Sequence, residues 1–174
     1  MSPLFGMETA RSPNESGDKS PHSKTADDLV FMMGKFPAAV PCDRRYAQNH
    51  MWCQSRGDRL RFGFSAYAVR LLQDVYFLEW SVDAGTDVRL RQEIGSIESS
   101  KAESALYAPM PGRIVEFNDS LLSDPSGINL DNYGGGWLFE MTGDASSMLS
   151  PEEYVKFLDE GWEKTQRTLK GQLH

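Results

Sequence analysis

The sequence predicts a mainly β fold, either a sandwich or a barrel, assembled from many short strands. Short apolar runs alternate with turn residues through the middle of the chain, with Gly85, Pro109 and Gly134 among the turn positions. Several of the runs are dense in β-branched and aromatic residues, which favour strands. A sustained helical period is found only near the C-terminus, so we expect few helices.

The length and composition fit one domain preceded by a tail. A chain of 174 residues with 40% hydrophobic content can bury one core of ordinary size. Residues 1–25 are rich in Ser, Pro and charged residues, and we expect them to be a disordered tail. Residues 26–45 are expected to form an extended arm, because the apolar segment with Met32, Met33 and Phe36 can pack on the domain or contact a partner. Residues 46–174 are expected to form the folded domain.

The expected elements of this domain follow in order from Leu60. Leu60, Phe62 and Phe64 alternate with polar or small residues, which is the two-residue period of a half-buried strand. Ser65 can accept a hydrogen bond from an amide of the next turn, so we expect it to cap a short helix that ends at Leu72. Further strands are expected at Val75–Trp80, Val88–Leu90, Glu93–Glu98, Ser104–Ala108, Arg113–Phe117 and Trp137–Met141.

The C-terminal segment has the clearest helical pattern. Ser150, Pro151 and Glu153 form a capping box with proline at the first helical position. Large apolar residues then recur every three to four positions, so that one stripe can pack on the β core. These residues are Tyr154, Phe157, Leu158, Trp162 and Leu169.

Charge and cysteine content exclude several classes of function. The net charge of −7 and the pI near 5.0 argue against sequence-independent binding of nucleic acid or of an anionic membrane. Cys42 and Cys53 do not make a secreted disulfide framework, and no signal-peptide pattern or membrane span is evident. We expect a cytoplasmic protein, with the mitochondrial matrix as the alternative. His22, His50 and His174 are far apart in the sequence, so neither a metal site nor a catalytic residue is expected.

One lysine lies between two strand-like runs. Lys101 follows Ser99 and Ser100 and precedes Ala102, with Glu98 and Glu103 on either side. Such a lysine would project from the tip of a hairpin. Taken alone, a lysine among Ser, Ala and Glu is ordinary solvated surface.

The order of motifs around this lysine resembles the glycine cleavage H-protein family. In that family the modified lysine lies in a Gly-x-Val-Glu-Ser-Val-Lys-Ala segment, and the similarity here extends from about Tyr46 to Leu158. The matching residues are Gly95, Glu98, Ser99, Lys101 and Ala102; Leu106 to Pro109, Gly112, Ile114 to Glu116 and Asn118; Pro125, Ile128, Asn129, Tyr133 and Gly136 to Leu138; and upstream Asn49 to Trp52 and Phe64 to Ala68, with Leu149 to Tyr154 at the final helix.

The resemblance implies a fold and a function. The fold is a lipoyl-domain-like flattened β-barrel, a barrel-sandwich hybrid, with a short internal helix and a C-terminal helix. The function is that of a carrier and not of an enzyme: lipoate attached to Lys101 accepts an aminomethyl group from glycine decarboxylase and passes it to aminomethyltransferase, in glycine catabolism and one-carbon metabolism. Dihydrolipoyl dehydrogenase reoxidises the lipoyl group, and a lipoyl ligase or transferase attaches it. Glu98, Ser99, Ala102 and Glu103 are the expected recognition residues around the lysine.

Several positions depart from the family pattern. Met51, Ala66 and Ala105 stand where the family has acids, and Ser100 replaces a valine before the lysine. The resemblance places several of these positions near the cleft that shelters the loaded arm. Three readings therefore stay open: a carrier in glycine cleavage, an H-like carrier for lipoate relay or another lipoate-dependent pathway, and a non-lipoylated interaction module that binds through the arm.

Overall fold

The computed structural model describes residues 28–172, and the side chains of residues 28–164. The tail expected at residues 1–25 lies outside this range. The elements are β2 (Leu29–Met33), β3 (Phe36–Val40), β4 (Arg45–Tyr46), β5 (Met51–Arg56), β6 (Arg59–Phe64), α1 (Ala66–Leu72), β7 (Val75–Trp80), β8 (Asp87–Val88), β9 (Glu93–Ser99), β10 (Glu103–Tyr107), β11 (Gly112–Phe117), α2 (Asp119–Ser123), α3 (Gly127–Leu130), β12 (Phe139–Thr142) and α4 (Pro151–Gln172).

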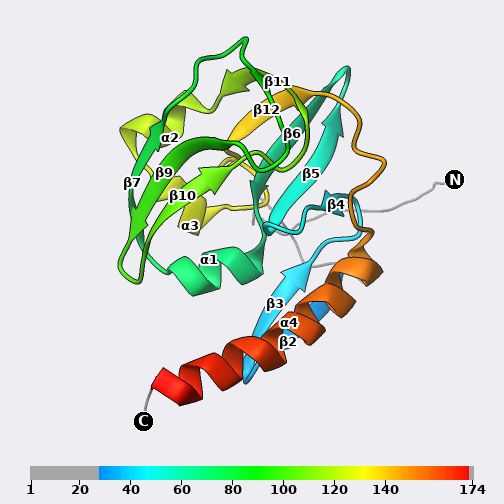
Figure 1. The fold of residues 1–174 in the computed structure, drawn as a ribbon, viewed down its shortest axis with the longest axis vertical. Coiled ribbons are helices and arrows are strands. Elements are labelled where there is room, and N and C mark those ends of the chain that lie inside the picture. Colours follow the sequence, from blue (N-terminus) through cyan, green and yellow to red (C-terminus); the bar gives the residue numbers. More distant parts are fainter. Residues whose placement is uncertain (1–27, 173–174) are drawn as a thin grey trace, which may run out of the picture.

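Two antiparallel sheets enclose the main core. One sheet has six strands in the order β4-β5-β6-β12-β11-β8, and the other has three in the order β10-β9-β7 (Figure 1). Alternate residues of both sheets point inward, as the two-residue period of a strand requires. Phe62 and Phe139 come from the first sheet and Leu78, Ile97 and Leu106 from the second, and all five are buried in one cluster. The mainly β architecture predicted from the sequence is confirmed.

Every expected strand is present, although some of the ends differ. The strand expected at Val88–Leu90 is instead Asp87–Val88, because its partner β11 pairs only through Gly112 and Arg113. Leu90 lies beyond this pairing and is exposed. The strand expected from Trp137 begins at Phe139, where pairing with β6 and β11 starts. Propensity alone cannot locate these ends, because hydrogen-bonded partners decide them.

Both expected helix caps are present. The Ser65 hydroxyl accepts a hydrogen bond from the Ala68 amide at 3.3 Å and begins α1. The Ser150 hydroxyl accepts from the Glu153 amide at 3.1 Å, and the Glu153 carboxylate accepts from the Ser150 amide at 2.8 Å. This is the reciprocal capping box predicted for α4. The sequence pattern did not predict α2 and α3, which have only five and four residues.

Residues 29–40 form a hairpin, whereas the sequence predicts an extended arm here. Met33 and Phe36 are paired, and Gly34 has φ +63°, so the chain reverses over Gly34 and Lys35. Glycine at the first central position suits a two-residue hairpin turn. The hairpin lies against α4 and α1 (Figure 1). The boundary at residue 45 between an arm and a domain stays a prediction.

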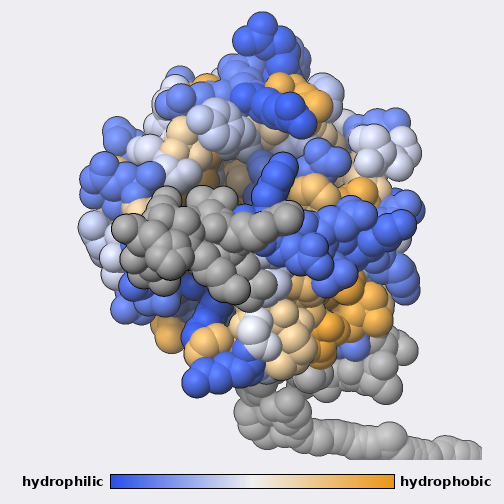
Figure 2. All heavy atoms as spheres, turned by 60° about the horizontal axis from the view of Figure 1, so that its bottom comes forward, coloured by the Kyte–Doolittle hydropathy of each residue, from blue (hydrophilic) through white to orange (hydrophobic). Residues whose placement is uncertain are grey.

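The β2–β3 hairpin and α4 enclose a second cluster of buried residues. Phe31 and Met33 of the hairpin are buried with Tyr154 and Leu158 of α4. On the outer side, Met32 and Phe36 remain exposed, and the Arg70 guanidinium lies 3.5 Å from the centroid of the Phe36 ring. Figure 2 shows that the end of the molecule carrying α4 has hydrophobic patches between strongly hydrophilic ones. One face of the hairpin therefore packs against α4, and the other face is exposed.

Candidate functional site

Lys101 lies at the tip of the β9–β10 hairpin, which ends beside α1 in Figure 1. Glu98 pairs with Glu103, so Ser100 and Lys101 make the turn between the strands. Lys101 is exposed. The hairpin anticipated from the sequence is therefore present, with this lysine at its end.

Two serines hold the backbone of the turn. The buried Ser99 donates its amide to the Ala102 carbonyl at 2.8 Å, and its hydroxyl accepts from the amides of Lys101 at 3.3 Å and Ala102 at 3.2 Å. Ser100 donates its amide to the Asp74 carbonyl at 2.9 Å and accepts from the Asp74 amide through its hydroxyl at 3.2 Å. None of these hydrogen bonds uses the Lys101 side chain, so the turn is ordered while the amine can take part in chemistry.

The other residues expected at the site lie around this turn. Ala102 and Glu103 are exposed and Glu98 is half-buried. Directly paired residues of an antiparallel ladder place their side chains on the same face, so Glu98 and Glu103 put two carboxylates side by side next to the lysine. Ser99 differs from the other three, because it is buried and shapes the turn from within. The sequence could not separate these roles, since burial decides them.

A cavity of about 300 Å³ opens beside the same hairpin. Ser104 and Ala105 of β10 and Ile97 of β9 form one wall, and α1 forms another side through Ala68, Leu71 and Leu72. The remaining wall residues are Asn49, His50, Met51, Phe64, Leu106 and Tyr107. Of the three positions where the resemblance led us to expect acids, Met51 and Ala105 lie in this wall, whereas Ala66 does not. The sequence does not show that Met51 and Ala105 share a cavity, because they lie far apart along the chain.

His50, one of the residues of this wall, is the last member of a series of hydrogen bonds. The Ala68 amide donates to Ser65 Oγ at 3.3 Å, Ser65 Oγ and Tyr154 Oη are 2.7 Å apart, and Tyr154 Oη is 3.0 Å from His50 Nδ1. Burial lowers the pKa of His50 to about 4, so the imidazole is neutral at pH 7. If Tyr154 donates to Nδ1, the ring proton lies on Nε2. His50 also has φ +70°, an uncommon conformation for histidine.

Asn49 lies between this cavity and a second one of about 500 Å³. Its side-chain amide donates to the Tyr107 carbonyl at 3.0 Å. Within the described residues its buried Oδ1 atom has no hydrogen-bond partner. A buried acceptor without a donor is costly, so a donor from water or from a bound group would stabilise this atom.

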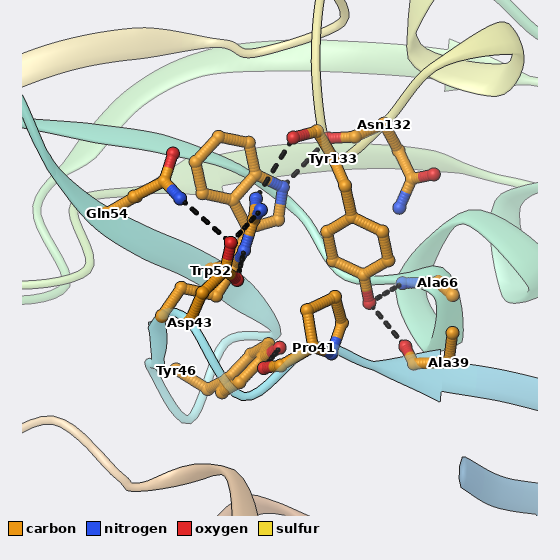
Figure 3. Close-up of polar contacts among 10 residues, drawn as sticks. Ala39, Pro41, Asp43, Tyr46, Trp52, Gln54, Ala66, Asn132 and Tyr133 are labelled. Carbon is orange, nitrogen blue, oxygen red and sulfur yellow. Dashed lines mark hydrogen bonds and ion pairs between the residues drawn. The ribbon is translucent and has the colours of Figure 1, made fainter. Parts of the chain in front are cut away.

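We define the Tyr133 cluster as Arg44, Tyr46, Trp52 and Tyr133, which are all buried. Its three aromatic residues belong to one core cluster, and Arg44 lies over the rings of Trp52 and Tyr133. Figure 3 shows Tyr46, Trp52 and Tyr133. The Tyr133 hydroxyl donates to the Ala39 carbonyl at 2.6 Å and accepts from the Ala66 amide at 2.8 Å. Trp52 Nε1 donates to the Asn132 carbonyl at 2.8 Å, and Arg44 lies over the Trp52 ring at 4.7 Å. The cluster therefore joins the β2–β3 hairpin to the start of α1. Burial raises the pKa of Tyr133 above its ordinary range, so the hydroxyl stays protonated.

A two-sheet β domain with an exposed lysine at a hairpin tip is the architecture of a lipoyl carrier domain, and comparison with known proteins gives the same class. The profile of the family "Glycine cleavage H-protein" matches residues 44–161. The glycine cleavage system H protein of Rubrobacter xylanophilus is 39% identical over 124 residues, covering 71% of this chain and 98% of that protein. The probable glycine cleavage system H protein of Natronomonas pharaonis is 41% identical over 118 residues, covering 66% and 93%.

A solved structure agrees with the sequence comparisons. The crystal structure of a glycine cleavage system H protein from Mycobacterium marinum superposes with a TM-score of 0.59 at 30% identity, covering 70% of this chain and 98% of that one. The chain belongs to the glycine cleavage H-protein family, a family of lipoyl carriers. The resemblance inferred from the motifs and the barrel-sandwich fold that it implied are both confirmed.

Proposed function

We propose that this protein is the lipoyl-carrying H protein of a glycine cleavage system and that Lys101 is the residue that carries the lipoyl group. The observation that supports this most directly is the exposed lysine on a turn that its neighbours already hold in place. An amide bond to this lysine costs the fold little, because an exposed tip residue buries almost nothing.

The residues around Lys101 fit a lipoyl arm. When bound, lipoate supplies a dithiolane that undergoes thiol–disulfide chemistry at a reach that no protein side chain provides. The chain supplies position: Ser99 and Ser100 fix the turn, and Ala102 leaves its exposed side small. Tethering keeps the reactive group at high effective concentration near a docked enzyme, so transient docking is sufficient.

Glu98 and Glu103 are proposed to orient the enzymes that act on the arm. Two neighbouring carboxylates give a local negative potential beside the lysine. Such a potential speeds and orients encounter with a basic surface more than it raises affinity. The partners proposed are a lipoyl ligase or transferase, glycine decarboxylase, aminomethyltransferase and dihydrolipoyl dehydrogenase, and the proposed location is the cytoplasm. No helix among the described residues is long and apolar enough to cross a bilayer.

Mass spectrometry of the intact protein tests the attachment. The protein is produced in cells supplied with lipoate and then mapped by peptide analysis around Lys101. We expect the mass increase of one lipoyl group on that peptide and on no other. An unmodified Lys101 in the presence of a competent ligase, or a lipoyl group on another lysine, would contradict the proposal.

A second candidate function is carriage of lipoate for another pathway. One observation favours it: Met51 and Ala105, where the resemblance led us to expect acids, both line the cavity beside the β9–β10 hairpin. Reconstitution separates the two functions. The lipoylated protein is mixed with glycine decarboxylase, aminomethyltransferase, dihydrolipoyl dehydrogenase, NAD⁺, glycine and tetrahydrofolate, and glycine-dependent methylenetetrahydrofolate is measured. A lipoylated protein that supports no turnover, beside a relative that does, would favour the second function.

A further inference from the structure

The larger cavity that Asn49 adjoins, of about 500 Å³, lies away from the Lys101 turn. Its lining includes Tyr107, the last residue of β10, which is four residues beyond Glu103 at the start of that strand. At the usual rise of an extended chain, Tyr107 is about 13 Å along the strand from Glu103. The other walls come from the connection between β8 and β9, from the segment before α4 and from α4 itself. We call this space the Arg91 cavity.

The Arg91 cavity has the properties of a small-molecule site. Its volume falls within the range of roughly 300 to 1,000 Å³ that is usual for such sites, and most of its lining residues are apolar. Leu90 and Tyr107 are large apolar side chains that are 53% and 44% exposed, and both line this cavity. Met148 and Ala108 also line it and are buried. A ligand with an apolar body would remove the exposed part of this wall from water, which is favourable.

Arg91 gives this apolar wall a positive charge. Among the described residues that line the cavity, Arg91 is the only charged one, and none is Asp or Glu. Its guanidinium makes no ion pair or hydrogen bond with another described residue, whereas Arg44, Arg59, Arg61 and Arg113 all pair with carboxylates. A guanidinium binds a carboxylate through two parallel hydrogen bonds, so the charge of this wall is complementary to an organic acid.

Backbone hydrogen bonds fix the position of Arg91. Its φ is +67°, a conformation that is uncommon for a residue other than glycine. The Arg91 amide donates to the Ala108 carbonyl at 3.0 Å, and the Ala108 amide donates to the Gln92 carbonyl at 2.8 Å. The turn that carries Arg91 is therefore tied to the end of β10 that carries Tyr107, and the charge and the apolar wall belong to one frame.

Asn49 adds a hydrogen-bonding position to the lining. Its side-chain amide already donates to the Tyr107 carbonyl at 3.0 Å, and its buried Oδ1 atom has no donor among the described residues. An N–H or O–H group on a ligand is one of the donors that would stabilise this atom.

We propose that the Arg91 cavity binds a small organic carboxylate with an apolar body and an N–H or O–H donor. The carboxylate pairs with Arg91, the apolar body covers Leu90 and Tyr107, and the donor group binds Asn49 Oδ1. This binding site does not involve Lys101, so it stands apart from the proposed carrier function.

Three indole compounds of similar shape test this assignment. Indole-3-propionate has the apolar ring, the N–H donor and the carboxylate. Indole-3-propionamide lacks the charge, and 1-methylindole-3-propionate lacks the donor. Each compound is titrated in the millimolar range into the full isotope-labelled chain, and the NMR signals of the backbone amides of Leu90 and Leu149 are followed. Those of Ala68 and Ser104, which line only the other cavity, serve as the reference.

We expect indole-3-propionate to shift the Leu90 and Leu149 signals in a saturable manner and to leave the reference signals in place. Each analogue should have a dissociation constant that is higher by about fivefold or more, because each lacks one polar contact. No saturable shift with indole-3-propionate, equal affinity for either analogue, or larger shifts at Ala68 and Ser104 would overturn the proposal.

Substitution of Arg91 assigns the charge effect to this residue. Asparagine tolerates positive φ, so Arg91→Asn removes the guanidinium without new backbone strain. Its affinity for indole-3-propionate should fall to that for the amide, and its affinity for the amide should stay unchanged. Arg89→Asn is the matched control, because Arg89 is exposed two residues earlier and does not line the cavity. Equal losses in the two variants, or no loss in a folded Arg91→Asn protein, would refute the role of Arg91.

Salt gives the same test on the unchanged protein. Added sodium chloride should weaken binding of indole-3-propionate and not of indole-3-propionamide, because an exposed ion pair is screened. Affinities that respond equally to salt would show that no ion pair forms. Lys101→Arg should bind all three compounds as the wild-type protein does, so a failure of lipoylation would leave this site untouched. Loss of binding in Lys101→Arg would place the compounds at the turn and contradict the proposal.

Discussion

Hydrogen bonds serve different purposes in the Lys101 turn and in the Tyr133 cluster. At the turn, Ser99 and Ser100 form hydrogen bonds with backbone amides, and the Lys101 side chain remains exposed to solvent. In the Tyr133 cluster the side chains are themselves buried, and the polar groups of Tyr133, Trp52 and Arg44 join segments distant in sequence, as when Tyr133 links Ala39 to Ala66. The turn therefore positions chemistry at little cost in stability, whereas the cluster stabilises the fold and takes no direct part in chemistry.

This difference gives an order of expected effects. Substitutions within packed backbone or buried polar groups should reduce the free energy of unfolding, and substitutions at the turn should change modification alone. The expected loss of stability decreases from Gly112→Val to Lys101→Arg. A departure from this order would show that the two regions are less distinct than the structure indicates.

Gly112→Val should have the largest effect. Gly112 has φ +159°, and a Cβ atom there would overlap the Thr142 carbonyl oxygen of the neighbouring strand. We expect a loss of about 3 kcal/mol or more in the free energy of unfolding, measured by chemical denaturation. Gly57→Val is the control, because Gly57 has φ +68° but no atom within 4 Å of its Cβ position. Equal losses in the two variants would show that backbone strain, and not the overlap, is responsible.

His50→Asn should remove a pH dependence of stability. The folded-state pKa of His50 is about 4, below its ordinary value of 6.5, so the unfolded chain binds the proton first as pH falls. The native protein should lose stability as pH falls from about 6.5 through about 4, by up to about 3 kcal/mol from this group. Asparagine tolerates positive φ and can accept from Tyr154, so the variant should fold but lack this slope. Identical slopes in both proteins would show that His50 is not held neutral.

Tyr133→Phe should have an intermediate effect. It removes the hydroxyl and leaves the Ala39 carbonyl and the Ala66 amide without that partner. We expect a loss of about 1 to 3 kcal/mol, with faster amide hydrogen exchange in the β2–β3 hairpin and at the start of α1. Tyr76→Phe removes a hydroxyl from a side chain that is 60% exposed and should be neutral. If Tyr76→Phe lost as much stability as Tyr133→Phe, the loss in Tyr133→Phe could not be attributed to the burial of its hydroxyl.

Lys101→Arg should have the smallest effect on stability. The side chain is exposed and the turn is held by its neighbours, so the free energy of unfolding should change by less than about 0.5 kcal/mol. Lipoylation and all carrier activity should be lost, as measured by intact mass and by reconstitution. A marked fall in melting temperature would mean that Lys101 has a structural role.

Part of the site could be predicted from the sequence because it depends on local order. The turn from Ser99 to Ala102 is a contiguous segment, so its position between two strands is visible in the alternation and in the motif around Lys101. The residues that line the cavity, in contrast, are not contiguous in the sequence. His50, Ala68 and Ala105 come together only because β9, β10 and α1 pack against one another, and no spacing in the sequence records that contact.

The sequence by itself determined the mainly β class, most of the strands, the capped ends of α1 and α4, and the lysine at a hairpin tip. These follow from short-range physics: side-chain alternation, capping and turn chemistry act over a few residues. Only the tertiary structure decided where strands end, that residues 29–40 pair into a hairpin against α4, and that Met51 and Ala105 face one cavity. Those features depend on burial and on partners far along the chain, and burial is what makes His50 neutral and Ser99 structural.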